Sequence, residues 1–522
     1  MTAALAIRVL TLLLATSLVT IGSGSRSNVV AEDTWTESRF HTGCEPGPFH
    51  EPPPPEHLET HFPPLGTASN SATVRVNLGE TLPSAPQPIL GVGFNLEHAL
   101  WSCPEFRGLF RSEVLDAFKP AIARVDSGLL PAAPPELSAA DLGPAVYESV
   151  LSSPAYASSW KFFHRLNREG VRIVLGVSGG PGQFTEDGTR LGRLLSSHYD
   201  DYVQYVSTVV NFLVRKQKIK IWATTIANEP DGGDGNQIPP DGLAYIAHRL
   251  APLLAEDGVK LYGPDTSNAD NAMEYLPPLL DDALVSENLA FVAFHQYYES
   301  SSVQSVVDYV HQRRPGLPVV ITEYTSFSFG DLDDGQEANA QTGFALDIAA
   351  TLLSHFRYGV DAAIYCDAVD YLQPGHDAIT KWGILRGPAD DFERRPRYYG
   401  LLQILPYLQP GARVLADTIE GDDQLHELAV RTAEGVPAIF LVNQDFVPVD
   451  VTLNLSGAEA SRYADLSVTR TQRDRFADRV GRLRLEEGEG RLTVPPRSIT
   501  TLFPSGAGPQ PDDTALAPRP TF

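Results

Sequence analysis

Two glutamates, each at the end of an apolar run, are the residues of this sequence best suited to chemistry. Glu229 follows the β-branched stretch 219–227 in the tripeptide Asn-Glu-Pro, and Glu323 follows the apolar stretch 317–322. Both runs are typical of buried strands, so each carboxylate is expected at a strand end. Two carboxylates placed in this way can cleave a glycosidic bond, one as general acid and base and the other as nucleophile.

The segments that must position these glutamates alternate between short apolar strands and helices. Apolar residues recur at helical spacing in stretches such as 155–169 and 199–215. Eight strands are predicted, at residues 89–95, 121–126, 172–178, 219–227, 259–263, 290–295, 319–323 and 362–366. The pattern predicts an α/β fold, a (β/α)8 TIM barrel. A doubly wound sheet is the alternative, but no glycine-rich phosphate turn follows the first strand.

The periodicity changes after residue 410, where short alternating strands predict an accessory antiparallel β-sandwich. These strands are expected at 425–431, 438–443, 449–455, 464–469, 490–494 and 499–503. An early alternating strand at 73–78 has no role in the barrel, so we expect it to pair into the sandwich. The predicted organisation is a signal peptide at 1–31, a Pro-rich segment at 32–69, the sandwich strand at 70–87, the catalytic barrel at 88–408, the C-terminal sandwich at 409–505 and a disordered tail at 506–522.

The N-terminus predicts export. An apolar run over residues 3–21 is interrupted by Arg8 and is followed by the small-residue site Val29-Val30-Ala31, which is typical of a secretion signal. A single N-terminal membrane anchor is the alternative. We therefore expect a secreted, periplasmic or extracellular protein with no membrane contact beyond the signal peptide.

Charge and cysteine content exclude several partner classes. With 65 acidic and 40 basic residues the net charge is −25, which argues against nucleic acid as a partner. The three cysteines form no CxxC and no metal-ligand spacing, so neither a metal nor a cofactor is expected. At most one disulfide can form, and the alternatives are Cys44–Cys103 or none.

Active sites of such barrels lie at the C-terminal ends of the strands, and polar residues gather there. They are Arg124, Asn228, Glu229, His295, Tyr297 and Glu323, with Trp382 in the loop after the last strand. Charged groups at buried strand ends are costly unless they are paired, so this convergence favours a site. A guanidinium stabilises the ionised form of a neighbouring carboxyl, which selects Glu323 as the anion if Arg124 lies beside it. Glu229 would then carry the proton.

Other acidic residues are interpreted as structural. Asp126, Asp231, Asp265 and Asp367 are expected to be loop or capping residues. The acidic run 331–334 is expected to be a solvated loop.

The two glutamate motifs, with Arg124 before them and His295-x-Tyr297 between them, resemble those of the clan A glycoside hydrolases. The similarity is to families 39, 30 and 79, which also build a β-sandwich from both chain ends, and it covers roughly residues 70 to 505 at the level of architecture. From Arg124 the strand predicted at 121–126 reads Arg-Val-Asp-Ser-Gly, which matches no one family's signature, so the family within the clan stays open.

The resemblance implies a role for each motif residue. Glu229 corresponds to the acid/base and Glu323 to a nucleophile that forms a covalent glycosyl-enzyme with retained configuration. The substrate-binding residues would be Asn228 at the sugar 2-hydroxyl, Arg124 and Tyr297 (less surely His295) beside the nucleophile, and Trp382 as a platform under the sugar ring.

The expected function is that of a secreted retaining β-glycoside hydrolase acting on an oligosaccharide, polysaccharide or glycoside. The β-glucuronidase, β-xylosidase and β-glucosidase or glucanase types are equally compatible with the sequence. A non-catalytic carbohydrate-binding barrel and a transglycosylase are the alternatives.

Overall fold

The computed structural model describes residues 69–125, 136–232, 235–326, 338–371, 380–388, 391–473 and 475–505. The predicted signal peptide, the Pro-rich segment up to residue 68, the tail from residue 506, the acidic run 331–334 and Asp126 lie outside these residues. Within the described ranges, no helix has both the length and the apolar character needed to cross a membrane.

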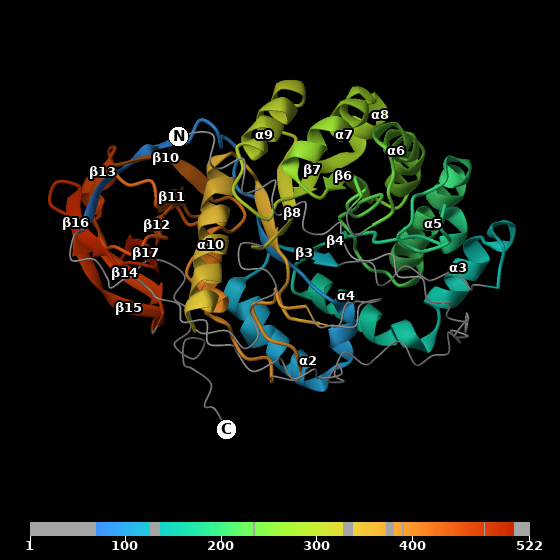
Figure 1. Cartoon of the computed structure of the whole chain (residues 1–522), viewed down its shortest axis with the longest axis horizontal. Helices are drawn as coiled ribbons and strands as arrows, with labels where there is room; N and C mark the ends of the chain where they lie inside the picture. The colour runs from blue at the N-terminus through green and yellow to red at the C-terminus, as the bar shows by residue number, and fades with distance from the viewer. Residues whose placement is uncertain are drawn as a thin grey trace, which may run out of the picture. The chain divides into compact units, whose positions relative to one another are not determined.

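A closed barrel of eight parallel strands forms the centre of the fold (Figure 1). Its strands are β2 (Gly91–Asn95), β3 (Ile122–Val125), β4 (Arg172–Leu175), β5 (Ala223–Thr224), β6 (Lys260–Thr266), β7 (Leu289–His295), β8 (Val319–Tyr324) and β9 (Ala362–Tyr365). β2 pairs in parallel with both β3 and β9, which closes the barrel. Buried side chains such as Val174, Phe291 and Val320 fill its interior. The predicted TIM barrel is confirmed.

Helices surround the barrel (Figure 1), and helices such as α4 and α5 bury the apolar faces that the sequence indicated. They are α2 (Pro104–Phe110), α3 (Pro144–Leu151), α4 (Ala157–Arg168), α5 (Tyr199–Asn211), α6 (Pro240–Ala255), α7 (Ala269–Asp281), α8 (Ala283–Asn288), α9 (Ser302–Arg313), α10 (Ala338–Arg357) and α11 (Pro396–Leu402). In α4, for example, Trp160, Phe163 and Leu166 are buried on one face. The predicted helix 199–215 is α5 followed by one wider turn, Phe212–Lys216.

The fourth barrel strand is shorter than predicted. Regular pairing covers Ala223–Thr224 alone, although 219–227 was expected to form a strand. Backbone hydrogen bonds continue on both sides, from Trp222 N to Ile173 O at 2.8 Å and from Asn228 N to Val177 O at 2.6 Å. The chain therefore follows β4 to the rim without keeping regular strand geometry, and at the rim Glu229 takes a left-handed φ of 41°.

A second sheet of nine strands, in the order β15-β14-β17-β12-β11-β10-β1-β13-β16, is mostly antiparallel. Its strands are β1 (Asn70–Thr81), β10 (Arg413–Glu420), β11 (Leu425–Arg431), β12 (Pro437–Asn443), β13 (Val449–Ser456), β14 (Asp465–Gln472), β15 (Arg475–Arg484), β16 (Glu489–Val494) and β17 (Ser498–Pro504). This sheet fits the predicted accessory sandwich, which confirms the fold class.

β1 lies between strands from the other end of the chain. It pairs antiparallel with β10 and parallel with β13, in a register that places Val74 opposite Ile419 and Leu453. Sequence analysis did not predict β10 or β15. β15 is an edge strand whose charged side chains mostly face solvent, so it lacks the apolar alternation that reveals a strand.

Candidate active site

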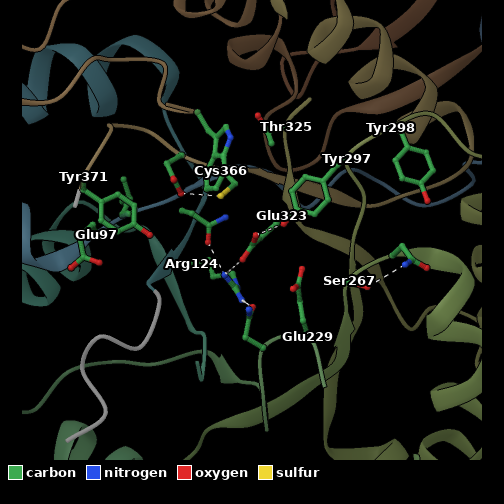
Figure 2. Close-up of a pocket in the computed structure, with 16 residues that line it drawn as sticks. Glu97, Arg124, Glu229, Ser267, Tyr297, Tyr298, Glu323, Thr325, Cys366 and Tyr371 are labelled. Carbon is green, nitrogen blue, oxygen red and sulfur yellow. Dashed lines mark hydrogen bonds and ion pairs between the residues drawn. The ribbon is translucent and has the colours of Figure 1, made fainter. Parts of the chain in front are cut away.

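A cavity of about 360 Å³ opens at the C-terminal end of the barrel strands (Figure 2). Six of the seven residues predicted for the site line it: Arg124, Asn228, Glu229, Tyr297, Glu323 and Trp382. The seventh, His295, is fully buried at the end of β7 and contacts the side chain of Glu229. The structure therefore brings all seven predicted residues together.

Arg124, at the C-terminal end of β3, organises one side of the cavity. Its Nη1 donates to Glu323 Oε1 at 2.5 Å and to Asn95 Oδ1 at 2.9 Å. Its Nη2 donates to Asn228 Oδ1 at 2.5 Å and to Asp265 Oδ2 at 3.1 Å. Because the guanidinium is always charged and its fork is rigid, these contacts fix the position of the Glu323 carboxyl group.

Tyr297 holds the second oxygen of the same carboxylate. Its hydroxyl donates to Glu323 Oε2 at 2.6 Å. Burial, together with the charges of Glu323 and Glu229, raises the pKa of Tyr297 well above its ordinary value, so the phenol keeps the proton that it donates. Glu323 thus receives one strong hydrogen bond on each oxygen.

Glu229 lies across the cavity from Arg124, where the chain leaves the barrel wall. Its backbone N–H donates to Asp265 O at 2.9 Å, which holds the left-handed turn in place. Such a backbone conformation costs a non-glycine residue about 1 kcal/mol and is concentrated at functional sites. The carboxyl itself is nearly buried, with 11% of the side chain exposed, and its Oε1 is 2.8 Å from His295 Nδ1.

His295 stands between the carboxyl groups. Its Nδ1 is 3.6 Å from Glu323 Oε2, and its Nε2 is 3.6 Å from Asp265 Oδ1. Burial alone would lower the pKa of His295, but the charge of Glu323 and the contacts with Asp265 and Glu229 outweigh it and raise the pKa to about 10. The ring is therefore positively charged at neutral pH, and its Nδ1 is within hydrogen-bond distance of Glu229 Oε1.

Asp265 is a central residue that the sequence analysis missed, and its interpretation as a loop or capping residue was wrong. It lies in β6, is fully buried, and accepts hydrogen bonds from Arg124 and from Thr322 Oγ1. Burial would raise its pKa, but the charge of Arg124, the nearby charge of His295 and the hydrogen bond from Thr322 lower it to about 2. The predicted strand ended at residue 263, and extending it to Thr266 would have placed Asp265 at the rim.

Asn95 is the second residue that was missed. It ends β2, its Oδ1 accepts from Arg124, and its Nδ2 donates to Thr322 O at 3.1 Å. The signal was present, because Asn95 is the last residue of the first predicted strand, and a polar residue at a strand end is the criterion that identified the other site residues.

The remaining acidic residues differ in their roles. Asp231 behaves as the expected loop residue, because its carboxylate accepts hydrogen bonds from Ser267 and Asn271. Asp367 also lies in a loop, after β9, but it lines the cavity and is almost fully buried, and burial raises its pKa well above the ordinary value. Cys103 is buried, and Cys44, its expected disulfide partner, lies outside the described residues.

A family model described as "Glycosyl hydrolase catalytic core" matches residues 204–359, a stretch that contains Glu229, His295, Tyr297 and Glu323. No curated protein matches the chain. Among solved structures, a GH30 endoxylanase from Clostridium papyrosolvens C71 superposes with a TM-score of 0.63 at 18% identity, covering 83% of this chain and 99% of that one.

Two further solved structures are similar. A family 30 subfamily 8 xylanase from Clostridium acetobutylicum has a TM-score of 0.62 at 16% identity, with 83% of this chain and 99% of that one covered. An endo-β1,6-glucanase has a TM-score of 0.59 at 18% identity, with 83% and 94% covered. At these identities the structures show the fold. Together with the family model, they confirm the predicted resemblance to the clan A glycoside hydrolases and the predicted enzyme class, a glycoside hydrolase.

Proposed function

We propose that this chain is a retaining β-glycoside hydrolase in which Glu323 is the nucleophile and Glu229 is the acid/base. The observation that carries the proposal is the unequal environment of the two carboxyl groups. Glu323 receives donors on both oxygens, from Arg124 and Tyr297, which suits a permanent anion. Glu229, whose Oε1 is 2.8 Å from His295 Nδ1, lines the same cavity and is placed to give a proton to the leaving oxygen.

The spacing of the carboxyl groups supports retention of configuration. His295 Nδ1 is 2.8 Å from Glu229 Oε1 and 3.6 Å from Glu323 Oε2, so these two oxygens cannot be further apart than the two distances combined, about 6.4 Å. Retaining enzymes place the two carboxyl groups about 5–5.5 Å apart, whereas inverting enzymes need roughly 6.5–9.5 Å to admit a water molecule.

In the first step, Glu323 attacks the anomeric carbon, the bond to the glycosidic oxygen breaks, and Glu229 gives its proton to that leaving oxygen. In the second step, Glu229 takes a proton from water, and the water oxygen displaces Glu323 from the same carbon. Two displacements return the original configuration. Arg124, Tyr297 and His295 are in place before the reaction, so they need little reorganisation as the charge moves.

The charge of the cavity favours an uncharged sugar. Its described lining includes the acidic residues Glu97, Glu229, Glu323 and Asp367, while Arg124 is its one Arg or Lys side chain. Arg124 already donates to Glu323, as well as to neighbouring amide and carboxylate oxygens. A uronate would therefore meet the carboxylates of Glu97 and Glu323, so we favour the β-glucoside and β-xyloside types over the β-glucuronide type.

We also propose that the chain is exported. The apolar run over residues 3–21 and the small-residue site at 29–31 support this proposal.

Azide rescue tests the assignment of roles. Wild type, Glu229→Ala and Glu323→Ala are assayed on aryl β-glucosides, β-xylosides and β-glucuronides, with the exposed Glu274→Ala as a matched control. Azide should restore Glu229→Ala and give a β-glycosyl azide, because it attacks the glycosyl-enzyme in place of water. With Glu323→Ala, azide should give the α-product.

Two results would overturn the proposal: a wild type that cleaves no glycoside or oligosaccharide of these sugars, and a first-formed product of inverted configuration by NMR. Faster hydrolysis of glucuronides than of the uncharged sugars would overturn the choice of substrate class alone.

A further inference from the structure

Tyr298 is an exposed aromatic residue at the edge of the catalytic cavity. Five large apolar side chains of the described residues are exposed: Leu191, Tyr245, Leu253, Leu284 and Tyr298. Of these, Tyr298 is the one that lines the cavity, with half of its surface open to solvent. Exposed aromatic surface beside a polar site is a feature of ligand-binding positions, because the ring offers a large contact area at a small entropy cost.

The backbone that carries this ring is fixed. Gln296, which is almost fully buried, donates from Nε2 to Tyr298 O at 2.8 Å. The Oε1 of the same amide accepts from Ala269 N at 3.1 Å, at the start of α7. One side chain thus ties the segment after β7 to the segment after β6, and the ring is presented from an ordered position.

Figure 2 shows that the cavity extends on both sides of the catalytic pair. Tyr298 and Ser267 lie beyond Glu229, whereas Glu97 and Tyr371 lie on the other side, beyond Arg124. In the proposed reaction Glu229 must reach the oxygen of the leaving group. The side beyond Glu229 is therefore the side on which the leaving group binds.

Polar groups accompany the ring on that side. Ser267 and Asn268 also line the cavity. Asp231 fixes Ser267 by accepting from its hydroxyl and its backbone N–H, and Asn268 Oδ1 accepts from Asn271 N at 2.8 Å. A flat aromatic face with hydroxyl and amide groups beside it matches a sugar ring, which has apolar C–H faces and hydroxyls at its edge.

We propose that Tyr298 is the platform for a sugar ring in the leaving group, so that the substrate is an oligosaccharide or polysaccharide with a sugar on each side of the cleaved bond. This inference rests on the proposed function and deepens it. It excludes a substrate class in which the leaving group is small, since such a group would leave the ring of Tyr298 exposed to water.

Glycosyl fluorides separate the two sides of the cavity, because fluoride is a leaving group of one atom that cannot reach the platform. The specificity constant kcat/KM is measured on xylobiose and β-xylosyl fluoride, and on cellobiose and β-glucosyl fluoride. For the sugar that wild type hydrolyses, Tyr298→Ala should lower the ratio of the disaccharide value to the fluoride value by about tenfold.

Two further variants serve as controls. Tyr298→Phe keeps the aromatic ring and should restore the ratio, and Tyr245→Ala removes a similarly exposed tyrosine from α6, away from the cavity, and should leave the ratio at the wild-type value. An unchanged ratio in Tyr298→Ala would overturn the platform. A wild type that cleaves neither the fluorides nor the disaccharides would refute the proposed function itself.

Discussion

Replacing Asp265 by Asn removes a buried negative charge while keeping the size of the side chain. Asp265 is fully buried, and it accepts from Arg124 Nη2 at 3.1 Å and from Thr322 Oγ1 at 2.5 Å. The amide of Asp265→Asn retains one acceptor oxygen, but its N–H2 group must then face a donor. We expect a large loss of stability from this isosteric change.

The magnitude follows from the pKa of Asp265, which is about 2 in the folded protein against an ordinary value of 3.8. Lowering the pKa of Asp265 from 3.8 to about 2 corresponds to roughly 2.5 kcal/mol of stabilisation at neutral pH. Breaking a buried ion pair by removing one partner costs about 3–5 kcal/mol. Because the amide preserves part of the hydrogen bonding, we expect Asp265→Asn to lower the free energy of unfolding by about 3 kcal/mol at pH 7.

Urea unfolding between pH 3 and pH 7 measures this effect. Because the folded-state pKa lies below the unfolded-state value, the stabilisation is complete above pH 5 or so and is lost as the pH falls towards 2. The difference in the free energy of unfolding between wild type and Asp265→Asn should therefore become smaller as the pH falls from 7 to 3.

Asp116→Asn is the matched control for this prediction. Asp116 pairs with Arg111 at 3.2 Å, but both side chains are more than 60% exposed, so its loss should cost no more than about 1 kcal/mol. The reasoning would be refuted if Asp265→Asn and Asp116→Asn lowered the free energy of unfolding equally. It would also be refuted if the difference between wild type and Asp265→Asn did not change with pH.

Two further predictions concern single hydrogen bonds and single charges. Tyr297→Phe removes the hydroxyl that donates to Glu323 Oε2. A hydrogen bond to a charged group is worth about 1.5–3 kcal/mol, so kcat/KM should fall by roughly 10–100-fold while circular dichroism shows an intact fold. A loss of less than threefold in kcat/KM would contradict the proposed role of Tyr297. Burial raises the pKa of Asp361 to about 7, so its folded form binds a proton that the unfolded chain releases near pH 4. In thermal unfolding, the melting temperature of wild type should therefore fall relative to that of Asp361→Asn as the pH rises from 4 to 7. If the melting temperatures of the two proteins change with pH in parallel, the Asp361 carboxyl is already ionised in that range and the prediction is wrong.

Sequence analysis succeeded where the local pattern and the tertiary environment agree. Barrel strands that are apolar on both faces, such as β7, have one structural interpretation, and their polar end residues meet because parallel strands share one rim. Glu229, Glu323 and Arg124 could therefore be placed from the sequence.

The remaining features depend on contacts between segments distant in sequence. Asp265 resembles a loop residue locally, and it is the charge of Arg124 on β3 that makes its burial tolerable. His295 was expected only to line the site, because its charge is set by Glu323, Asp265 and Glu229, which lie on three other segments. β15 has too few apolar residues to be recognised without knowing that it pairs with β14.

The position of β1 has a consequence for the order in which the molecule can fold. This strand is synthesised before the barrel, yet its neighbours β10 and β13 follow the barrel, with Thr73 paired to Glu420 and to Thr452. During synthesis β1 therefore has no strand to pair with until β10 has been made, and until then the apolar side chains of Val74 and Val76 are not buried in the sheet. Pairings so distant in sequence form late and slowly. A chain cut after the barrel would keep β1 but never provide either neighbour, so the second sheet is expected to form only in a chain that extends through β13.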